Sequence, residues 1–294
     1  MFSIIVPSYN RKDEIPHLLA SLEKQTEHNF EVIIVDDCSK EAVEVEQNYP
    51  FSVRVIRNQI NQGAAESRNI GAHQAQNDWL LFLDDDDRFI ENKCQVLRHI
   101  IEKNPEINFI YHPAECVMVN EGFTYFTHPF KDEKEINIES ILAANKIGGM
   151  PMIAVKKALF LKNNGLSTAL RSLEDYEFLL KLISDPEFNP KYVDQSLTRC
   201  TFHTQRASVS TDNKNTQAAI DYIQQHYVKT VEQQQNFKLN SLYMLAYPHI
   251  MNLSRKAAKY YFLMFSLTRK IKFLVITLII LISPKLAINM KRFI

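Results

Sequence analysis

The sequence has few cysteines, and their spacing pairs none of them with another. Cys38, Cys94, Cys116 and Cys200 are scattered along the chain. Zinc sites and disulfide frameworks need cysteines at recognisable spacings, so neither is indicated, and a reducing compartment is expected. No secretory signal is expected either, because the apolar run Phe2–Val6 is far shorter than a signal-peptide core and no basic residue precedes it.

Acidic residues are missing from the last part of the chain. All 34 Asp and Glu residues lie at or before Glu232, whereas residues 233–294 contain ten Lys and Arg. The formal net charge of zero therefore hides an acidic main part and a basic tail. A basic tail predicts an acidic partner surface, and because this tail is also apolar, we expect anionic lipid rather than nucleic acid.

No hydrophobic run is long enough to cross a bilayer. The most apolar segment, Ile271–Ile282, has twelve residues, and as a helix it would reach about 18 Å of a ~30 Å hydrocarbon core. Lys and Arg flank it on both sides. We expect residues 269–294 to lie on an anionic membrane surface. Packing of this run on the rest of the protein, or on a partner chain, is the alternative.

Short apolar runs alternate with helical patterns through the first half of the sequence. The runs predicted as buried strands are Phe2–Val6, Glu31–Val35, Val53–Arg57, Trp79–Leu83 and Ile107–His112. Strand–helix–strand order favours a mostly parallel sheet flanked by helices, which is an α/β fold.

The second half is predicted in less detail. Residues 116–126 are typical of a hairpin, residues 192–203 of one last strand, and the chain from about residue 215 onward of helices.

Four consecutive aspartates, Asp84–Asp87, follow the run Trp79–Leu83 directly. Their position predicts the carboxyl edge of the sheet, where open α/β folds bind ligands. A solvated acidic turn is the ordinary alternative. Residues i and i+2 of an extended segment project to the same side, so Asp84 and Asp86 are expected to address one region. Tyr9 and the pair at 36–37 end neighbouring strands at the same edge.

Five segments together resemble glycosyltransferase family 2, whose members have the nucleotide-diphosphosugar fold called GT-A. The segments are VPSYNR at Val6–Arg11, IIVDDCS at Ile33–Ser39, NQGAAESRNIGA at Asn61–Ala72, FLDDDD at Phe82–Asp87 and LEDYEFLLKL at Leu173–Leu182. The resemblance implies a catalytic domain over residues 1–212, with a nucleotide-sugar half (1–112) and an acceptor half (113–212). Residues 213–294 would form a helical, basic extension.

The resemblance implies roles for residues around the donor nucleotide. Tyr9 would stack on the nucleobase beside Pro7, and Arg68 would reach the nucleotide. Asp37, with Asp36 as a second candidate, would accept the N–H of the base, and since a carboxylate only accepts, a uracil-type edge is expected. Helix capping for the aspartates and a surface ion pair for Arg68 are the ordinary alternatives.

The resemblance also implies that two acidic groups take part in the reaction. They are the acid run Asp84–Asp87 and the acid pair Glu174 and Asp175. Asp86 is expected to ligate Mn²⁺ or Mg²⁺, with Asp84 as a further ligand or ribose partner. Asp85 replaces the small residue usual between them in the family, which leaves the register open by one residue. Asp175 would be the general base, with Glu174 as the alternative.

A looser match concerns a basic pair near the diphosphate, His203 and Arg206. A structural role is the ordinary alternative for a lone histidine.

The resemblance thus implies an inverting, metal-dependent transferase that moves a sugar from a nucleotide diphosphate donor, expected to be UDP-linked, to a saccharide hydroxyl. A lipid-linked acceptor is expected, in surface-polysaccharide or lipooligosaccharide synthesis at the cytoplasmic face of the inner membrane. The sequence does not indicate an oligomeric state. A nucleotidyltransferase is one alternative, although PSYNRKDE after the first strand lacks the glycine expected there. A non-catalytic binding protein is the other.

Overall fold

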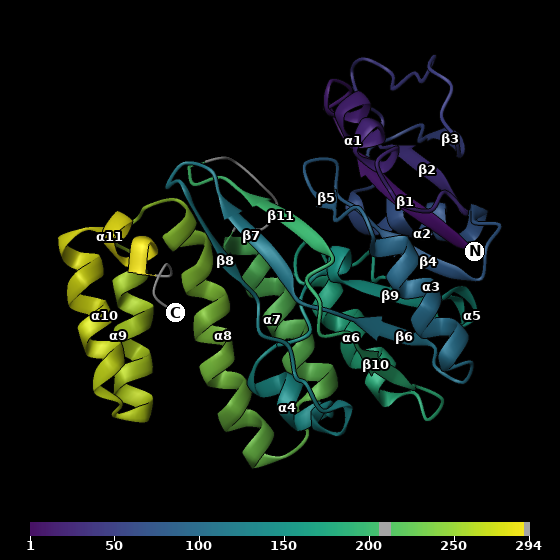
Figure 1. The fold of residues 1–294 in the computed structure, drawn as a ribbon. Coiled ribbons are helices and arrows are strands. Elements are labelled where there is room, and N and C mark those ends of the chain that lie inside the picture. The colour runs from purple at the N-terminus through teal and green to yellow at the C-terminus, as the bar shows by residue number, and fades with distance from the viewer. Residues whose placement is uncertain (206–212, 291–294) are drawn as a thin grey trace.

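A seven-stranded sheet forms the centre of the protein in the computed structural model, which describes residues 1–205 and 213–290 (Figure 1). The strand order is β10-β6-β9-β4-β1-β2-β3. The bounds are β1 Phe2–Ser8, β2 Phe30–Asp36, β3 Ser52–Arg57, β4 Trp79–Phe82, β6 Phe109–Tyr111, β9 Ile153–Lys156 and β10 Pro190–Tyr192. Among the strands of this sheet in the described residues, only β9 runs antiparallel to its neighbours, so the predicted, mostly parallel sheet is confirmed.

Helices cover both faces of this sheet, which is why its central strands are continuous apolar runs. In β1, Ile4 and Val6 pack on one side with α1 and α3, whereas Ile5 packs on the other side with α2 and α6. Burying each such side chain stabilises the fold by about 1.5–3 kcal/mol. The helices concerned are α1 Glu14–Leu22, α2 Ala64–Gln74, α3 Lys93–Lys103, α4 Ile138–Ala143, α5 Lys157–Lys162 and α6 Glu174–Ser184.

A second sheet of four strands lies beside the first, in the order β5-β11-β7-β8. Its strands are β5 Arg88–Phe89, β7 Ala114–Met118, β8 Phe123–Phe126 and β11 Thr198–Phe202. The predicted hairpin is confirmed as β7 and β8. Of the single strand predicted over 192–203, Thr198–Phe202 is confirmed as β11, whereas Tyr192 is the last residue of β10 in the other sheet. The polar residues Asp194, Gln195 and Ser196 lie between them.

The parallel register brings three strand ends to one edge. Phe2 of β1 pairs with Phe30 of β2 and with Trp79 of β4, so these strands run in step. Their carboxyl ends therefore place Ser8, Asp36 and the segment after Phe82 side by side.

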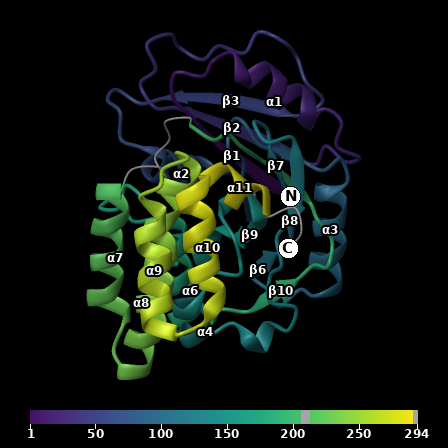
Figure 2. The same ribbon diagram turned by 90° about the vertical axis from the view of Figure 1, so that its left-hand side faces the viewer.

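In the described part of the chain five more helices follow; α7 and the start of α8 pack on the central core, and α9, α10 and α11 extend the molecule away from the central sheet (Figures 1 and 2). Their bounds are α7 Asn213–Tyr227, α8 Val231–Met251, α9 Ala257–Thr268, α10 Ile271–Ile282 and α11 Pro284–Asn289. Helix α8 packs on α4 on one side and on α9 on the other. Within the described ranges, no helix combines the length and hydropathy that crossing a bilayer requires.

Gly165 ends the α5 region in a conformation that disfavours a side chain. Its φ is +56°, and a Cβ there would lie 2.4 Å from Asn69 Oδ1 and 2.8 Å from Phe160 Cε1. We predict that Gly165→Ala lowers the free energy of unfolding by about 2–4 kcal/mol, since a left-handed conformation and a clash are combined. Urea unfolding followed by the fluorescence of Trp79, the single tryptophan, measures the change.

Gly122→Ala is the matched control for this substitution. Gly122 also has positive φ, +67°, but nothing lies within 4 Å of its Cβ position. It should cost only the conformational part, about 1–2 kcal/mol. Equal losses for the two variants would contradict the role of close contact at Gly165.

Candidate active site at the carboxyl edge of the sheet

The four aspartates after β4 form a turn. The backbone N–H of Asp87 donates to the carbonyl of Asp84 at 3.0 Å, and Asp85 and Asp86 occupy the turn between them. The extended segment predicted from the sequence is therefore wrong. Because the backbone reverses here, the i, i+2 argument for Asp84 and Asp86 does not apply, and the two carboxylates contact different arginines.

Arg11, three residues beyond β1, bridges the middle of the acid run. Its Nη1 lies 2.6 Å from Asp85 Oδ1 and 2.8 Å from Asp86 Oδ2. Burial raises the pKa of Asp85 to about 6, and the charge of Arg11 acts in the opposite direction. Ser8 Oγ also donates to Asp85 at 3.2 Å. No role was predicted for Arg11, although it lies within the VPSYNR motif.

Arg68 of α2 bridges the start of the acid run to α6. Its guanidinium lies 2.6 Å from Asp84 Oδ1 and 3.1 Å from Glu174 Oε1, and its side chain is 8% exposed. Burial alone would lower the pKa of Arg68, but the charges of Asp84 and Glu174 outweigh burial and raise it. Arg68 therefore stays charged and holds the predicted nucleotide and catalytic regions together.

The acid pair at the start of α6 is divided between two environments. Glu174 is bound by Arg68, whereas the Asp175 carboxylate accepts a hydrogen bond from the backbone N–H of Tyr176 at 2.7 Å. Burial raises the pKa of Asp175 to about 6, and the charge of Glu174 adds to this shift. A carboxylate with a pKa close to neutrality suits proton abstraction.

The backbone around this acid pair is tightly constrained. Leu173, just before it, has a left-handed φ of +59°, which is rare for a residue with a side chain. Gly149 lies against Asp175, since a Cβ on Gly149 would be 3.3 Å from Asp175 Oδ2. Contacts of this kind between distant segments were not foreseen from the sequence.

Asp37 anchors the loop that leads into α2. Its carboxylate accepts hydrogen bonds from Asn58 Nδ2 at 2.8 Å, Gln62 N at 2.8 Å and Gly63 N at 2.7 Å. Asp36 is fully buried and accepts from the backbone N–H groups of residues 39 and 43. Both aspartates therefore hold loops at the sheet edge, and Asp37 lies nearer to α2.

Two further candidates lie at the end of β1. Tyr9 is 49% exposed, which leaves its ring available for stacking, and Pro7 is half-buried in β1 beside Val35 of β2. Both lie at the carboxyl edge of the sheet, and their role at the nucleobase stays a prediction.

Of the predicted basic pair, only His203 lies within the described residues. His203 follows β11 and is half-buried. Two residues earlier, the backbone N–H of Thr201 donates to Asp87 Oδ1 at 2.8 Å, which ties β11 to the run. Arg206 lies outside the described residues.

The acid run fits a cation whose coordination is completed by substrate. In the described part of the chain, no three His, Cys, Asp or Glu side chains are grouped as metal ligands. Mg²⁺ sites commonly use only one or two carboxylates together with substrate phosphates. Asp84 and Asp86 retain 37% and 25% side-chain exposure, so both carboxylates can be reached from the open edge.

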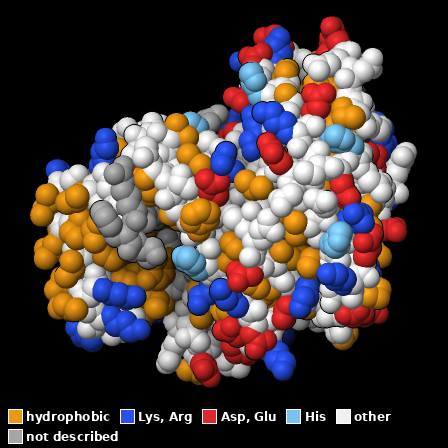
Figure 3. Space-filling model, viewed as in Figure 1, with side chains coloured by type: hydrophobic (Ala, Val, Ile, Leu, Met, Phe, Trp, Pro, Cys, Tyr) orange, Lys and Arg blue, Asp and Glu red, His pale blue; other side chains and the backbone are white. Residues whose placement is uncertain are grey.

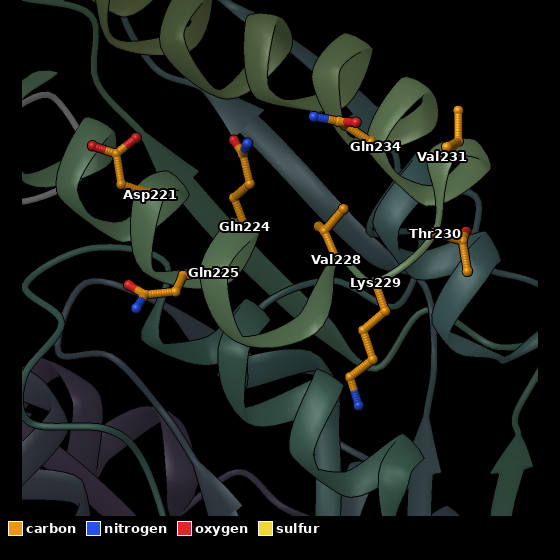
Figure 4. A pocket seen from close by; sticks show the side chains of 8 residues that line it. All are labelled: Asp221, Gln224, Gln225, Val228, Lys229, Thr230, Val231 and Gln234. Carbon is orange, nitrogen blue, oxygen red and sulfur yellow. The ribbon is translucent and has the colours of Figure 1, made fainter.

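Two cavities of the protein lie apart from the acid run. One, of about 480 Å³, lies at the turn from α7 to α8 and is lined by residues such as Gln225, Val228 and Lys229 (Figure 4). The other, of about 600 Å³, lies between α2, α5 and α7. Neither is lined by Asp84–Asp87 or Asp175.

The mostly parallel sheet, its acidic carboxyl edge and the acid pair on α6 together define a GT-A enzyme domain. The model of glycosyl transferase family 2 matches residues 3–163, which is more than half of the chain, and the chain belongs to this family. The predicted family is confirmed. The protein is thus a glycosyltransferase, and the nucleotidyltransferase alternative is not supported.

Relatives and solved structures agree with this family. An uncharacterized glycosyltransferase of Haemophilus influenzae is 69% identical over 292 residues, which is 99% of both chains. WfgD of Escherichia coli, a glucosyltransferase named for UDP-Glc and α-D-GlcNAc-diphosphoundecaprenol, is 29% identical over 63% of this chain and 70% of its own length. Staphylococcus aureus TarS with UDP-GlcNAc has a TM-score of 0.59 at 21% identity, over 88% of this chain and 83% of that one, and supports the fold.

A buried lysine supports the site from behind. Lys93, the first residue of α3, is fully buried, and its Nζ donates to Pro151 O at 2.8 Å and Thr198 Oγ1 at 2.9 Å. Pro151 lies two residues after Gly149, so this lysine holds the turn that meets Asp175. Burial lowers the pKa of Lys93 to about 7. In the sequence, Lys93 looks like an ordinary exposed residue at a helix start.

We predict that Lys93 makes stability rise with pH above neutrality. Its folded-state pKa of about 7 lies below the unfolded value of ~10.4, so between these values the unfolded chain binds a proton that the folded chain does not. The unfolding free energy of the wild type should therefore gain about 2 kcal/mol relative to Lys93→Met between pH 7 and pH 9. Urea unfolding at several pH values measures this gain, and a constant difference between the two proteins would contradict it.

Proposed function

We propose that the protein is an inverting, metal-dependent glycosyltransferase that uses a UDP-linked sugar. The observation that carries the proposal is the Arg68 bridge, which places Asp84 of the acid run and Glu174, the neighbour of Asp175, on one guanidinium. A candidate base and a candidate leaving-group site thereby lie at the same sheet edge. In this proposal residues 1–212 form the catalytic domain, divided near residue 112, and residues 213–294 form the extension.

The catalytic step assigns a separate task to each acid. Asp175 accepts the proton of the acceptor hydroxyl, and attack in line with the departing diphosphate inverts the anomeric carbon. Asp86 and Asp84 would hold Mn²⁺ or Mg²⁺, which when bound neutralises charge on the leaving diphosphate. Glu174 keeps Arg68 in place. Supporting this assignment, burial raises the pKa of Asp175, and its carboxylate lies against Gly149.

The proposed donor site lies at the carboxyl ends of β1 and β2. Tyr9 would stack on the uracil beside Pro7, and Asp37 would accept its imide N–H while Gln62 and Gly63 hold the carboxylate in place. Asp36 would support this loop. The likeness to TarS bound to UDP, and to the mannosyltransferase PcManGT of Pyrobaculum calidifontis bound to GDP-Man and Mn²⁺, is consistent with a nucleotide-sugar donor and a metal.

His203 and Arg206 would contact the diphosphate. Asp86 is proposed as the cation ligand in preference to Asp85. The proposal has to make this choice because both carboxylates contact Arg11.

The acceptor is proposed to be a saccharide, carried on a lipid. WfgD is named for a diphosphoundecaprenol-linked acceptor, and TarS for poly(ribitol-phosphate). Both names suggest acceptors of the bacterial surface, and we place this enzyme in surface-polysaccharide or lipooligosaccharide synthesis. It would work peripherally at the cytoplasmic face of the inner membrane, with residues 269–294 directed toward anionic lipid.

We predict that Asp175→Asn abolishes transfer and spares donor binding. The amide cannot take the proton, so kcat should fall by about 10²–10⁴-fold. A panel of nucleotide sugars with released UDP or GDP as the readout first identifies the donor for the wild type. Transfer by the variant is then measured with that donor, and UDP affinity by calorimetry.

Asp221→Asn, on the exposed surface of α7, serves as the control and should leave both quantities unchanged. Transfer by Asp175→Asn at near wild-type rates would refute Asp175 as the base. Loss of UDP binding would instead indicate a structural role.

A further inference from the structure

Helices α9 and α10 carry an apolar surface that no part of the described chain covers. Phe262 of α9 is 50% exposed, and Leu278 and Ile282 of α10 are 53% and 71% exposed. Ile271, Val275, Leu278 and Ile282 follow i, i+4, i+7, i+11 spacing, so they form one continuous stripe along α10. Figure 3 shows hydrophobic side chains gathered at this end of the molecule.

The opposite side of α10 is already used within the protein. Phe273, Thr277 and Ile280 are buried, and Phe273 packs with Met264 of α9 and Ala246 of α8. The packing alternative considered for residues 271–282 therefore accounts for one face of α10. It leaves the stripe of the other face without a partner.

Helices α9 and α10 form a helical hairpin, called the α9–α10 hairpin below. Cations border its apolar surface at both ends. Arg269, Lys270 and Lys272 are exposed at the turn between α9 and α10, and Arg255 and Lys256 are exposed just before α9. No acidic residue occurs from residue 233 onward. Exposed apolar side chains bordered only by cations match a helix that lies in the interface of an anionic membrane.

We propose that the exposed face of the α9–α10 hairpin docks on an anionic phospholipid bilayer, with the apolar stripe in the interface and the flanking cations on lipid headgroups. Both helices take part, which extends the docking region to Phe262 and Leu267 on α9. Twelve residues in α10 reach only about 18 Å as a helix, so the hairpin lies in the surface and does not span it.

Docking would also orient the candidate active site. Helix α8 packs on the hairpin and is tied to the catalytic side by Asn240, whose Nδ2 donates to Leu142 O at 3.1 Å and to Tyr176 Oη at 3.3 Å. Tyr176 directly follows Asp175. The docked hairpin would hold Asp175 in a fixed relation to the bilayer, and this consequence alone rests on the proposed function.

Vesicle flotation tests the docking surface with the full-length protein. Vesicles of phosphatidylcholine with phosphatidylglycerol should bind the wild type, and pure phosphatidylcholine vesicles should bind it much less. Val275→Glu with Leu278→Glu should reduce binding by at least about tenfold, since two charges enter the interface. Lys270→Gln with Lys272→Gln should reduce it about thirtyfold at low salt.

Val231→Glu is the matched control for the acidic variants. Val231 is 72% exposed at the start of α8, outside the hairpin, and its substitution should leave vesicle binding unchanged. Trp79 fluorescence confirms that each variant is folded. Equal binding by wild type and hairpin variants, or equal binding to both vesicle types, would overturn the proposal.

Two further outcomes separate this proposal from others. If the hairpin face instead joins two copies of the chain, the wild type will dimerise in sedimentation experiments, the acidic variants will not, and vesicles will bind neither. That result also overturns membrane docking. UDP release without vesicles should be unchanged in the hairpin variants, so failure of docking and failure of the proposed transferase reaction can be told apart.

Discussion

Charge neutralisation at the end of β4 is the constraint on which the rest of the site depends. Four adjacent carboxylates repel one another, and Asp85 and Asp87 are buried. Arg11 from the end of β1 and Arg68 from α2 offset this repulsion. The arginines thus hold β1, β4, α2 and α6 in one arrangement.

The same ion pairs separate the tasks of the acids. Glu174 is committed to Arg68, whereas burial beside that pair raises the pKa of Asp175. The buried Lys93 supports the turn that meets Asp175 from behind. On the far side, Asn240 connects Tyr176 to α8 and so to the apolar hairpin. The first turn of α6 therefore connects the ion pairs of the acid run with helix α8, on which the α9–α10 hairpin packs.

The sequence predicts what depends on local pattern and misses what depends on contacts between distant segments. Continuous apolar runs identify the strands around Ile4, Ile33 and Leu81, and the motifs identify the family. The turn within Asp84–Asp87 and the partners of Arg11 depend on long-range contacts that apolar periodicity does not report. The burial of Lys93 also depends on a long-range contact, because it follows from the packing of α3 against β11. Whether the acids and Arg68 act as proposed stays a prediction.

Calorimetric titration with UDP, in Mn²⁺ and in EDTA, tests most directly whether the neutralised acid run is a donor site. With Asp86 as the cation ligand, the wild type should bind UDP tightly only in Mn²⁺, and Asp86→Ala should bind equally weakly in both. Trp79 fluorescence would confirm that the variant is folded. Tight binding in EDTA, or metal-dependent binding that survives in Asp86→Ala, would contradict this account of the acid run.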